Sequence, residues 1–359
     1  HGYRRYATEL LHALVTLKEE YQWLLHGWSA SLDVKWIESL RKPGVELSLM
    51  RVPGHFKRLY WNTLRIPQIE SLIGSFDIFH STDPLLPPTR KKSIITIHDL
   101  VYLKFPHLVE RRVVRWGRQV RDNVARADAI VVVSSHTKRD VLEFFSVPES
   151  KLHVVYPIIS PRFTSVPASG DDEILARYSL QRPYILFVAT IEPRKNLLCL
   201  LQAYDRTSVA FRKEVKLVVV GRKGWKSEET VRAILRREEG GCVMWLRNVS
   251  DAELPALYRH AMMFVYPSLY EGFGFPVAEA LACGTPVITS TAASLPEVAG
   301  RAAVFVDPEK TEALTAAMES LAHDESAKRR LQQLGPERAR MFDPHHAVTM
   351  MLSLYRTLA

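Results

Sequence analysis

Residues 266–290 read YPSLYEGFGFPVAEALACGTPVITS and hold the densest chemical signal in the chain. A β-rich run opens the segment, and Pro276 stands at the favoured first position of a helix. Between them lie Glu271, Gly272 and Gly274. Glycines before a helix N-terminus let backbone N–H groups approach a ligand closely, and the helix dipole favours an anion such as phosphate. The segment therefore predicts an anion site where a strand ends.

Two carboxylates flank this anion site, Glu271 before it and Glu279 in the first turns of the helix. A carboxylate repels phosphate, but it accepts two hydrogen bonds from neighbouring sugar hydroxyls. Phosphate together with such a diol indicates a nucleotide sugar. The plainer interpretation is a solvated loop followed by a helix with a glutamate at its dipole-favoured end.

Strand-like and helix-like stretches alternate on both sides of this segment, and several strands are continuous Ile/Val runs. Such runs are typical of a buried parallel sheet covered on both faces. The expected strands of the first half are Tyr21–Leu25, Val45–Arg51, Phe76–Ser81, Ser93–His98, Ile130–Ser134 and Leu152–Tyr156. A Pro- and Ser-rich stretch at 157–172 reads as a linker, after which the alternation restarts. The sequence predicts an α/β fold of two βα domains, with the cleft between them as the default ligand site.

Composition excludes several classes of protein. The 359 residues favour two domains, and 47% hydrophobic with 24% charged residues excludes disordered and fibrous chains. The net charge of +9, of which +6 falls in residues 1–180, suits nucleic acid, anionic lipid or phosphorylated small molecules. The three cysteines form no CxxC pair, which indicates thiols in a reducing cytosol, and no apolar run reaches the roughly 20 residues of a membrane span. We expect a cytoplasmic protein.

The segment 266–290 resembles the Glu-x7-Glu signature of glycosyltransferase family 4, whose members are retaining enzymes with the GT-B fold. Other segments follow the family pattern in the same order: TIHDL (96–100), DAIVVVSSHTKR (128–139), FVATIEPRKNLL (187–198), RNVSDAELPAL (247–257) and SLPEVAGRAAVFVDP (294–308). Within the family the chain is most similar to bacterial mannosyltransferases of O-antigen and exopolysaccharide assembly.

The resemblance implies two facing Rossmann-like domains. Residues 1–160 would form an acceptor-binding domain, on which residues 344–359 pack back, and residues 161–343 a nucleotide-sugar-binding domain.

The resemblance also assigns roles in the donor site. Glu279 would bind the ribose hydroxyls, and Glu271 the transferred sugar near its C3 and C4 hydroxyls. Backbone groups of the loop after Glu271 would hold the sugar and phosphates, and those after the strand near residue 246 would line the base pocket. The residues concerned are Gly272, Phe273, Gly274 and Phe275 in the first loop, and Asn248 and Val249 in the second.

Two cations clamp the diphosphate in this family. Lys195 matches the family lysine, but Thr190 stands where the family has arginine. Arg194 or Arg222 would then supply the second charge, unless these are only solvated loop residues. Fixed cations matter because negative charge grows on the leaving nucleoside diphosphate in the transition state.

Two further site residues are expected in the first half. His98 matches a family histidine near the donor sugar, where it would stabilise positive charge or orient a hydroxyl; otherwise it is a structural histidine at a strand end. Residues 2–6, GYRRY, resemble the end of the family's glycine-rich loop, so that Gly2 would let the acceptor approach the donor phosphates. The first strand and most of that loop are then missing from this sequence.

The expected reaction is metal-independent transfer of a hexose, mannose from GDP-mannose, to a glycan or polyprenyl-diphosphate-linked acceptor with retained anomeric configuration. Glu271 is not assigned as a nucleophile, since the family favours a front-face mechanism. Catalytic roles are expected for His98, Glu271 and Lys195, with no resident cofactor. A UDP-sugar donor and a non-catalytic nucleotide-sugar-binding subunit remain as alternatives, and an epimerase is less favoured.

Six arginines fall on one predicted helix, Leu108–Ala127: Arg111, Arg112, Arg115, Arg118, Arg121 and Arg126. The plain interpretation is a solvated helix face. The functional one is docking of the helix, through Arg111, Arg115 and Arg118, on the anionic inner face of the cell membrane, at about 1 kcal/mol per basic residue. No motif supports a nucleic-acid partner.

Overall fold

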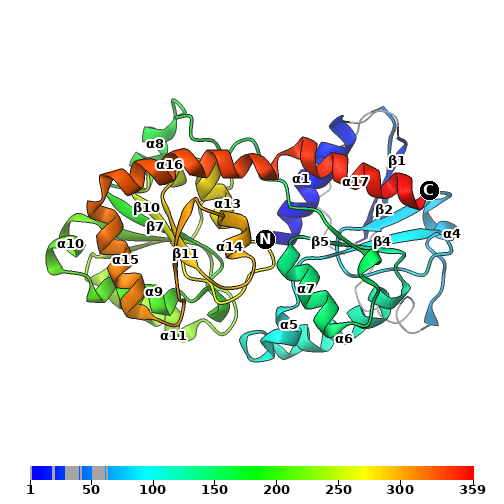
Figure 1. Cartoon of the computed structure of the whole chain (residues 1–359), viewed down its shortest axis with the longest axis horizontal. Coiled ribbons are helices and arrows are strands. Elements are labelled where there is room, and N and C mark those ends of the chain that lie inside the picture. Colours follow the sequence, from blue (N-terminus) through cyan, green and yellow to red (C-terminus); the bar gives the residue numbers. More distant parts are fainter. Residues whose placement is uncertain (1, 18–20, 29–39, 41–42, 51–60, 62–63) are drawn as a thin grey trace. The chain divides into compact units, whose positions relative to one another are not determined.

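The computed structural model describes residues 2–17, 21–28, 40, 43–50, 61 and 64–359 (Figure 1). The chain divides into two compact units, each built from α-helices and parallel strands. The first comprises residues 1–98, 115–158 and 342–359, and the second residues 99–114 and 159–341.

The strands of the first unit form two separate parallel sheets. In one, β1 (Trp23–Trp28) pairs with β2 (Val45–Met50). The other has the order β3-β4-β5-β6, with β3 (Ile78–Ser81), β4 (Lys92–Ile97), β5 (Ala129–Val132) and β6 (Leu152–Val154). Its central strands are the Ile/Val runs of the sequence, and every residue of β5 is buried. The predicted strands of this unit overlap the observed ones, and their ends differ by at most three residues; Arg51, an expected strand end, lies outside the described residues.

Helices of the first unit bury apolar faces against these strands. On α1 (Gly2–Leu17), Tyr6, Leu10 and Leu14 recur at helical spacing and are at most 2% exposed. The last helix, α17 (Pro344–Leu358), begins with proline, is capped by Asp343 and packs against α1. Among the described residues, this unit also contains α4 (Glu70–Ile73), α7 (Ser135–Phe144) and the short turn η3 (Glu149–Lys151). The helix α6 (Arg111–Arg126) begins in the second unit and continues in the first.

The second unit has one six-stranded parallel sheet in the order β12-β11-β10-β7-β8-β9. Its strands are β7 (Tyr184–Val188), β8 (Lys216–Val220), β9 (Val243–Leu246), β10 (Met263–Tyr266), β11 (Val287–Ser290) and β12 (Ala303–Val306). The first strand, β7, lies in the middle, and the chain then builds outward to one side and afterwards to the other. This is the 3-2-1-4-5-6 order of the doubly wound Rossmann fold.

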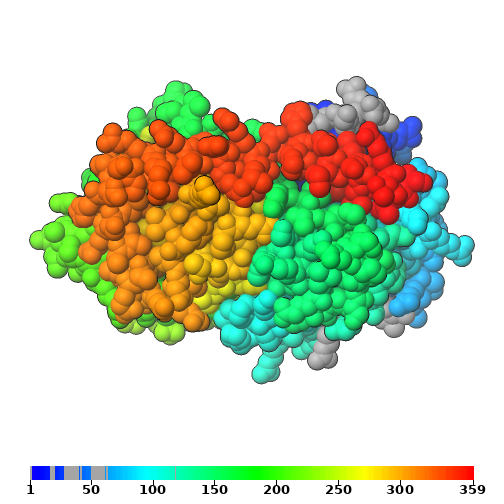
Figure 2. Space-filling view, viewed as in Figure 1, coloured from blue at the N-terminus to red at the C-terminus, as the bar shows by residue number. Residues whose placement is uncertain are grey.

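Helices cover both faces of this sheet. They are α8 (Asp171–Arg177), α9 (Leu197–Arg206), α10 (Val209–Glu214), α11 (Glu228–Glu239), α12 (Leu254–His260), α13 (Phe275–Ala282), α14 (Leu295–Ala299), α15 (Thr311–His323) and α16 (Glu325–Ala339). α15 packs on α9 and α16 on α13, and both form the orange surface on the face shown in Figure 2. Gly335 allows the close approach of α16, since a Cβ there would lie 2.8 Å from the carbonyl oxygen of Leu281. Among the described residues, no helix has the length and apolarity to cross a bilayer.

Residues 99–114 belong to the second unit although the chain on both sides of them belongs to the first. They contain α5 (Val101–Lys104) and the turn η2 (Pro106–Leu108). The amide of Leu100 donates to the Tyr270 hydroxyl (3.2 Å), and Trp225 Nε1 donates to the carbonyl of Leu108 (3.0 Å). The domain boundary expected from the sequence, near residue 160, would leave residues 99–114 in the first domain. We call this segment the 99–114 excursion.

His80 on β3 connects three elements of the first unit. Its Nδ1 lies 2.8 Å from the hydroxyl of Tyr355 on α17, and its Nε2 lies 3.1 Å from Oγ1 of Thr96 on β4. Burial lowers the pKa of His80 to about 4, so the ring is neutral at pH 7.

The pKa of His80 is lower in the folded chain than in the unfolded chain, so protonation favours unfolding. The free energy of unfolding is therefore unaffected by His80 above about pH 6.5, and it falls as the pH drops toward 4. We expect a loss of about 2 kcal/mol attributable to His80, less than the full shift implies because the ring keeps partial access to water. Urea unfolding of wild type and His80→Gln at pH 7 and pH 4.5 measures it. Equal losses in both chains would contradict this role.

Candidate active site

The carboxyl ends of β7 and β10 meet at the point where the strand order of the second unit reverses. In open parallel sheets, ligands bind at such a switch point, because the loops after the two central strands diverge there. The loop after β7 carries Arg194 and Lys195, and the loop after β10 carries Glu271. The topology thus brings together residues that are 76 and 77 positions apart in sequence.

Asn196 holds these two loops together. It ends the turn η4 (Pro193–Lys195) in the left-handed conformation, at φ 57°, which asparagine tolerates better than most residues. Its side-chain amide donates to the carbonyls of Pro267 (3.1 Å) and Pro308 (2.7 Å). The position of Lys195 relative to the β10 loop is fixed as a result.

The Glu271 carboxylate is the centre of the cluster. Lys195 Nζ lies 2.5 Å from its Oε1, and Arg194 Nη1 lies 2.8 Å from its Oε2. The hydroxyls of Tyr266 and Ser268 each donate to Oε1 at 2.8 Å. Only 6% of Glu271 is exposed, so the four donors replace the water that an exposed carboxylate would have.

The charges of this cluster determine its ionisation. Burial alone would raise the pKa of Glu271, but Arg194 and Lys195 outweigh it and lower that pKa to about 2. Burial, together with the charge of Arg194, lowers the pKa of Lys195. Burial opposes the charge of Arg194 too, but Glu271 and Glu192 raise its pKa well above the ordinary value.

Sequence reasoning did not identify Glu192, Tyr266 or Ser268 as members of the cluster. Glu192 is 4% exposed, and its Oε1 lies 2.6 Å from Arg194 Nε. Arg194 therefore bridges two buried carboxylates. Glu192 could have been found from the sequence, because it lies two residues before Arg194 in the segment 187–198 that resembles the family.

The loop from Glu271 to α13 follows the sequence prediction closely. Gly274 has φ 106°, a conformation that favours glycine, and a Cβ there would lie 2.7 Å from Cδ2 of Leu295, which would have to move. Pro276 stands in the first turn of α13. The Ser294 hydroxyl lies 2.9 Å from the carbonyl of Glu271 and 2.8 Å from that of Phe273, which fixes the loop from its carbonyl side.

Glu279 lies inside the unit rather than at its surface. It is on α13, is 0% exposed, and accepts a hydrogen bond from the Tyr258 hydroxyl at 3.1 Å. Its assignment to a ribose stays a prediction, and binding would require its carboxylate to become accessible.

The remaining donor-site candidates follow β8 and β9 at the same edge of the sheet. Arg222 is exposed, and its carbonyl accepts from the amide of Ile191 at 2.9 Å, which joins the β8 and β7 loops. Asn248 and Val249 follow β9, with Asn248 exposed and Val249 half-buried.

His98 and Gly2 lie in the first unit. His98 follows β4, donates from Nε2 to the carbonyl of Thr82 (2.8 Å), and is packed edge-on by the rings of Tyr3 and Tyr6. Gly2 is exposed at the start of α1, and a Cβ there would meet nothing within 4 Å. The structure thus brings Lys195, Arg194 and Glu271 together, and the roles of His98 and Gly2 stay predictions.

Comparison with solved structures identifies the fold. Sucrose-phosphate synthase from Thermosynechococcus elongatus has a TM-score of 0.78 at 19% identity, covering 98% of this chain and 92% of that chain. HepE of Anabaena, solved in complex with UDP-glucose, has a TM-score of 0.78 at 14% identity, covering 99% of this chain and 96% of that chain. The fold is that of the GT-B glycosyltransferases, which confirms the predicted α/β class with two Rossmann-like domains.

Sequence comparison identifies the family. Residues 1–163 match Glycosyltransferase Family 4, and residues 174–338 match Glycosyl transferases group 1. O-antigen chain mannosyltransferase B of Escherichia coli is 30% identical over 285 residues, which are 78% of this chain and 74% of that protein. Serotype-specific mannosyltransferase WbdA of the same species is 28% identical over 67% of this chain and 30% of its own length. The chain belongs to this glycosyltransferase family, as the resemblance predicted.

Replacing Glu271 by glutamine tests the cluster. The change leaves Arg194 and Lys195 buried with one carboxylate fewer, so we expect the free energy of unfolding to fall by about 3–5 kcal/mol at pH 7. The pKa of Glu271 is lower in the folded chain, so its contribution is full above about pH 4.5 and is lost as the pH falls toward 2.

Urea unfolding measures this loss. Glu239→Gln, the same chemical change at an exposed helix end, is the matched control and should change stability by less than about 0.5 kcal/mol. A Glu271→Gln chain as stable as the control would show that the ion pairs do not support the fold.

Proposed function

We propose that this glycosyltransferase moves a hexose from a nucleotide sugar to a glycan or lipid-linked glycan, with retained anomeric configuration and without a metal. The observation that supports the proposal best is the Glu271 carboxylate bound by Lys195 and Arg194 at the switch point. Mannose from GDP-mannose is the preferred donor, because curated relatives are named mannosyltransferases.

The cations are suited to a leaving diphosphate. The ammonium of Lys195 has three N–H donors and can bind a phosphate oxygen while it contacts Glu271. Arg194 supplies the second positive charge, in place of the family arginine at Thr190, and the exposed Arg222 is the other candidate. Because both cations are held before the reaction, they stabilise the growing negative charge without reorganisation. The same charges perform the work that a divalent cation performs in other transferases.

Glu271 is suited to binding rather than to nucleophilic attack. A carboxylate with a pKa of about 2 and four donors on its oxygens is a weak base and a weak nucleophile. It can instead accept hydrogen bonds from sugar hydroxyls. Retention then follows a front-face path. The bond from the anomeric carbon to the phosphate oxygen breaks, the acceptor oxygen bonds to that carbon on the same face, and the departing phosphate takes the proton of the acceptor hydroxyl. His98 would lie near the sugar in this scheme.

Glu279 and Glu271 should have separable effects. Glu279→Gln removes a charged acceptor for the ribose hydroxyls, so we expect nucleotide binding to weaken about tenfold or more. Glu271→Gln should mainly lower turnover, because its proposed contact is to the sugar. Calorimetric titration of GDP and initial-rate kinetics on both variants measure the two effects. Equal nucleotide affinity in wild type and both variants would overturn the assignment.

A donor screen distinguishes the alternatives. Thermal shifts with GDP, UDP, ADP and their sugars, followed by transfer assays with and without EDTA, should show stabilisation by GDP-mannose and a rate that EDTA leaves unchanged. Stabilisation by UDP-sugars instead would support the second donor, which HepE of Anabaena was solved with. Binding without hydrolysis or transfer would support a non-catalytic subunit.

A membrane contact of α6 belongs to the same proposal, because a lipid-linked acceptor lies at the bilayer. Arg111 and Arg115 are exposed, and the side chain of Arg118, the third expected residue, lies outside the described part of the chain. Arg126 donates to the carbonyl of Pro87 (2.9 Å) and is part of the fold. We therefore assign the contact to the start of α6, and place the protein at the cytoplasmic face of the membrane.

Cosedimentation with vesicles that contain phosphatidylglycerol tests this contact. Arg111→Glu combined with Arg115→Glu should lower vesicle affinity at least about tenfold, given about 1 kcal/mol per basic residue. The matched control is Arg329→Glu with Arg330→Glu, two exposed residues of α16 with the same change in charge. Equal losses in both double variants would attribute binding to net charge alone.

A further inference from the structure

Tyr270 is a buried tyrosine beside the charged cluster, and the proposed mechanism gives it no role. It directly precedes Glu271 and is 1% exposed. Its hydroxyl accepts a hydrogen bond from the amide of Leu100 (3.2 Å), and its ring packs on that of Phe105, with centroids 5.5 Å apart. Both partners belong to the 99–114 excursion, which is part of the second unit. The side chain of Tyr270 therefore attaches the β10 loop to the excursion.

The backbone of Tyr270 contacts the charged cluster itself. Its carbonyl accepts from Arg194 Nη1 (3.0 Å), the same nitrogen that lies 2.8 Å from Oε2 of Glu271. The Ser268 hydroxyl, which donates to Oε1 of Glu271 at 2.8 Å, lies 3.4 Å from this carbonyl as well. The Tyr270 carbonyl and the Glu271 carboxylate thus share two donors, so a shift of Tyr270 changes the contacts of that carboxylate.

The excursion also contributes a charge to the cluster. Asp99, its first residue, is half-buried, and its carboxylate accepts from the amide of Val101 at the start of α5 (3.3 Å). Against the effect of burial, Glu271 and two further carboxylates raise the pKa of Arg194 well above the ordinary value. Asp99 is one of these two, so the excursion helps to keep Arg194 charged.

A second attachment joins the excursion to the loop after β8. Nε1 of Trp225 donates to the carbonyl of Leu108 (3.0 Å), and Nζ of Lys226 donates to that of His107 (2.5 Å). Lys226 has φ 47°, in the left-handed region that lysine seldom adopts. A residue keeps such a conformation only where its surroundings hold it there. Trp225 and Lys226 therefore fix the β8 loop on the turn η2.

The two attachments lie on opposite sides of the central strand, because β7 lies between β10 and β8 in the sheet. Backbone hydrogen bonds extend the connection from the β8 loop to the β7 loop. The amide of Ile191 donates to the carbonyl of Arg222 (2.9 Å), and the amide of Gly224 donates to that of Ile191 (3.0 Å). The excursion is thus linked to all three loops that carry the candidate donor-site charges.

We propose that the 99–114 excursion is a clamp on the donor-site loops, and that Tyr270 is the positioning residue through which it holds Glu271. The inference rests on the proposed function, in which the donor binds at these loops. Attachment on both sides of β7 keeps the separation at which the Glu271 carboxylate meets the sugar while the cations meet the diphosphate. This separation matters because a displacement of about 1 Å can lower turnover about a hundredfold.

Tyr270→Phe tests the positioning role, since it keeps the ring and removes only the hydroxyl. The amide of Leu100, a fully buried residue, then loses its acceptor, so the excursion and the β10 loop must rearrange to pair it. We expect kcat for hydrolysis of GDP-mannose to fall at least about tenfold and GDP affinity to change less than about twofold, because Glu271 is assigned to the sugar. Initial rates and calorimetric titration of GDP measure the two quantities.

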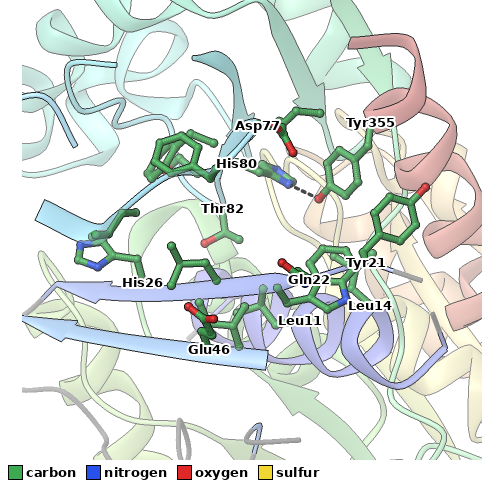
Figure 3. A pocket seen from close by; sticks show the side chains of 18 of the residues that line it. Leu11, Leu14, Tyr21, Gln22, His26, Glu46, Asp77, His80, Thr82 and Tyr355 are labelled. Atoms are coloured by element: carbon green, nitrogen blue, oxygen red, sulfur yellow. Dashed lines mark hydrogen bonds between the residues drawn. The ribbon is translucent and has the colours of Figure 1, made fainter. Parts of the chain in front are cut away.

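Two matched controls remove the same atom elsewhere. The Tyr204 hydroxyl donates to the carbonyl of Val215 (2.7 Å), directly before β8 and so at the opposite edge of the sheet. The Tyr355 hydroxyl lies 2.8 Å from Nδ1 of His80 in the first unit (Figure 3). Tyr204→Phe and Tyr355→Phe should lower the free energy of unfolding as Tyr270→Phe does, but should leave kcat unchanged.

Amide hydrogen exchange measures the attachment with no donor present. In Tyr270→Phe, residues 99–108 and 267–275 should exchange at least about tenfold faster than in wild type, and in Tyr204→Phe they should not. A wild-type chain that neither binds nor hydrolyses GDP-mannose would contradict the proposed donor, and the exchange comparison would still decide whether the clamp exists.

Either of two results would overturn the clamp. One is exchange of residues 99–108 in Tyr270→Phe at the wild-type rate. The other is a kcat of Tyr270→Phe equal to that of the two control variants, which would make the hydroxyl a purely structural group.

Discussion

Four charges lie inside the second unit, where little water reaches them: Glu192 and Glu271, and Arg194 and Lys195. Burying a single such charge costs several kcal/mol, so each needs an opposite charge at contact distance. The β7 and β10 loops must therefore end close together and stay there. The central placement of β7 beside β10, the Asn196 side chain and the glycine at 274 all serve this requirement.

The need to pair each buried charge also determines how the cluster can bind a ligand. A binding site made of charges that already satisfy one another does not reorganise before a ligand arrives. In the proposed function, the diphosphate of the donor would bind Arg194 and Lys195 in part in place of Glu271, and hydroxyls of the sugar would donate hydrogen bonds to the Glu271 carboxylate. Ligand binding is in this sense an exchange of partners, which keeps the buried charges compensated at every stage.

Local patterns in the sequence were sufficient for most of the architecture. The Ile/Val runs became the buried strands, and the Gly and Pro residues of 271–276 became the turn into α13, because these features depend on the backbone itself. The cluster partners were harder to predict, since Glu192 and Ser268 are ordinary polar residues until the sheet order places them together. Residue 99 as a unit boundary depends on distant contacts of Leu100 and Leu108, which no local pattern encodes. The roles of His98, Gly2 and Glu279 stay predictions.

The excursion of residues 99–114 makes the chain cross between its units at four points rather than two. A cut at residue 160 would consequently give two fragments, neither of which is a unit. The first fragment would contain Leu100 and Leu108, whose hydrogen-bond partners Tyr270 and Trp225 would be in the second fragment. The second fragment would contain α17, and the first would contain α1, on which α17 packs. Tyr270 directly precedes Glu271 in sequence. Each unit is thus made of separate segments of the chain, and neither can be exchanged between relatives as one continuous stretch of sequence.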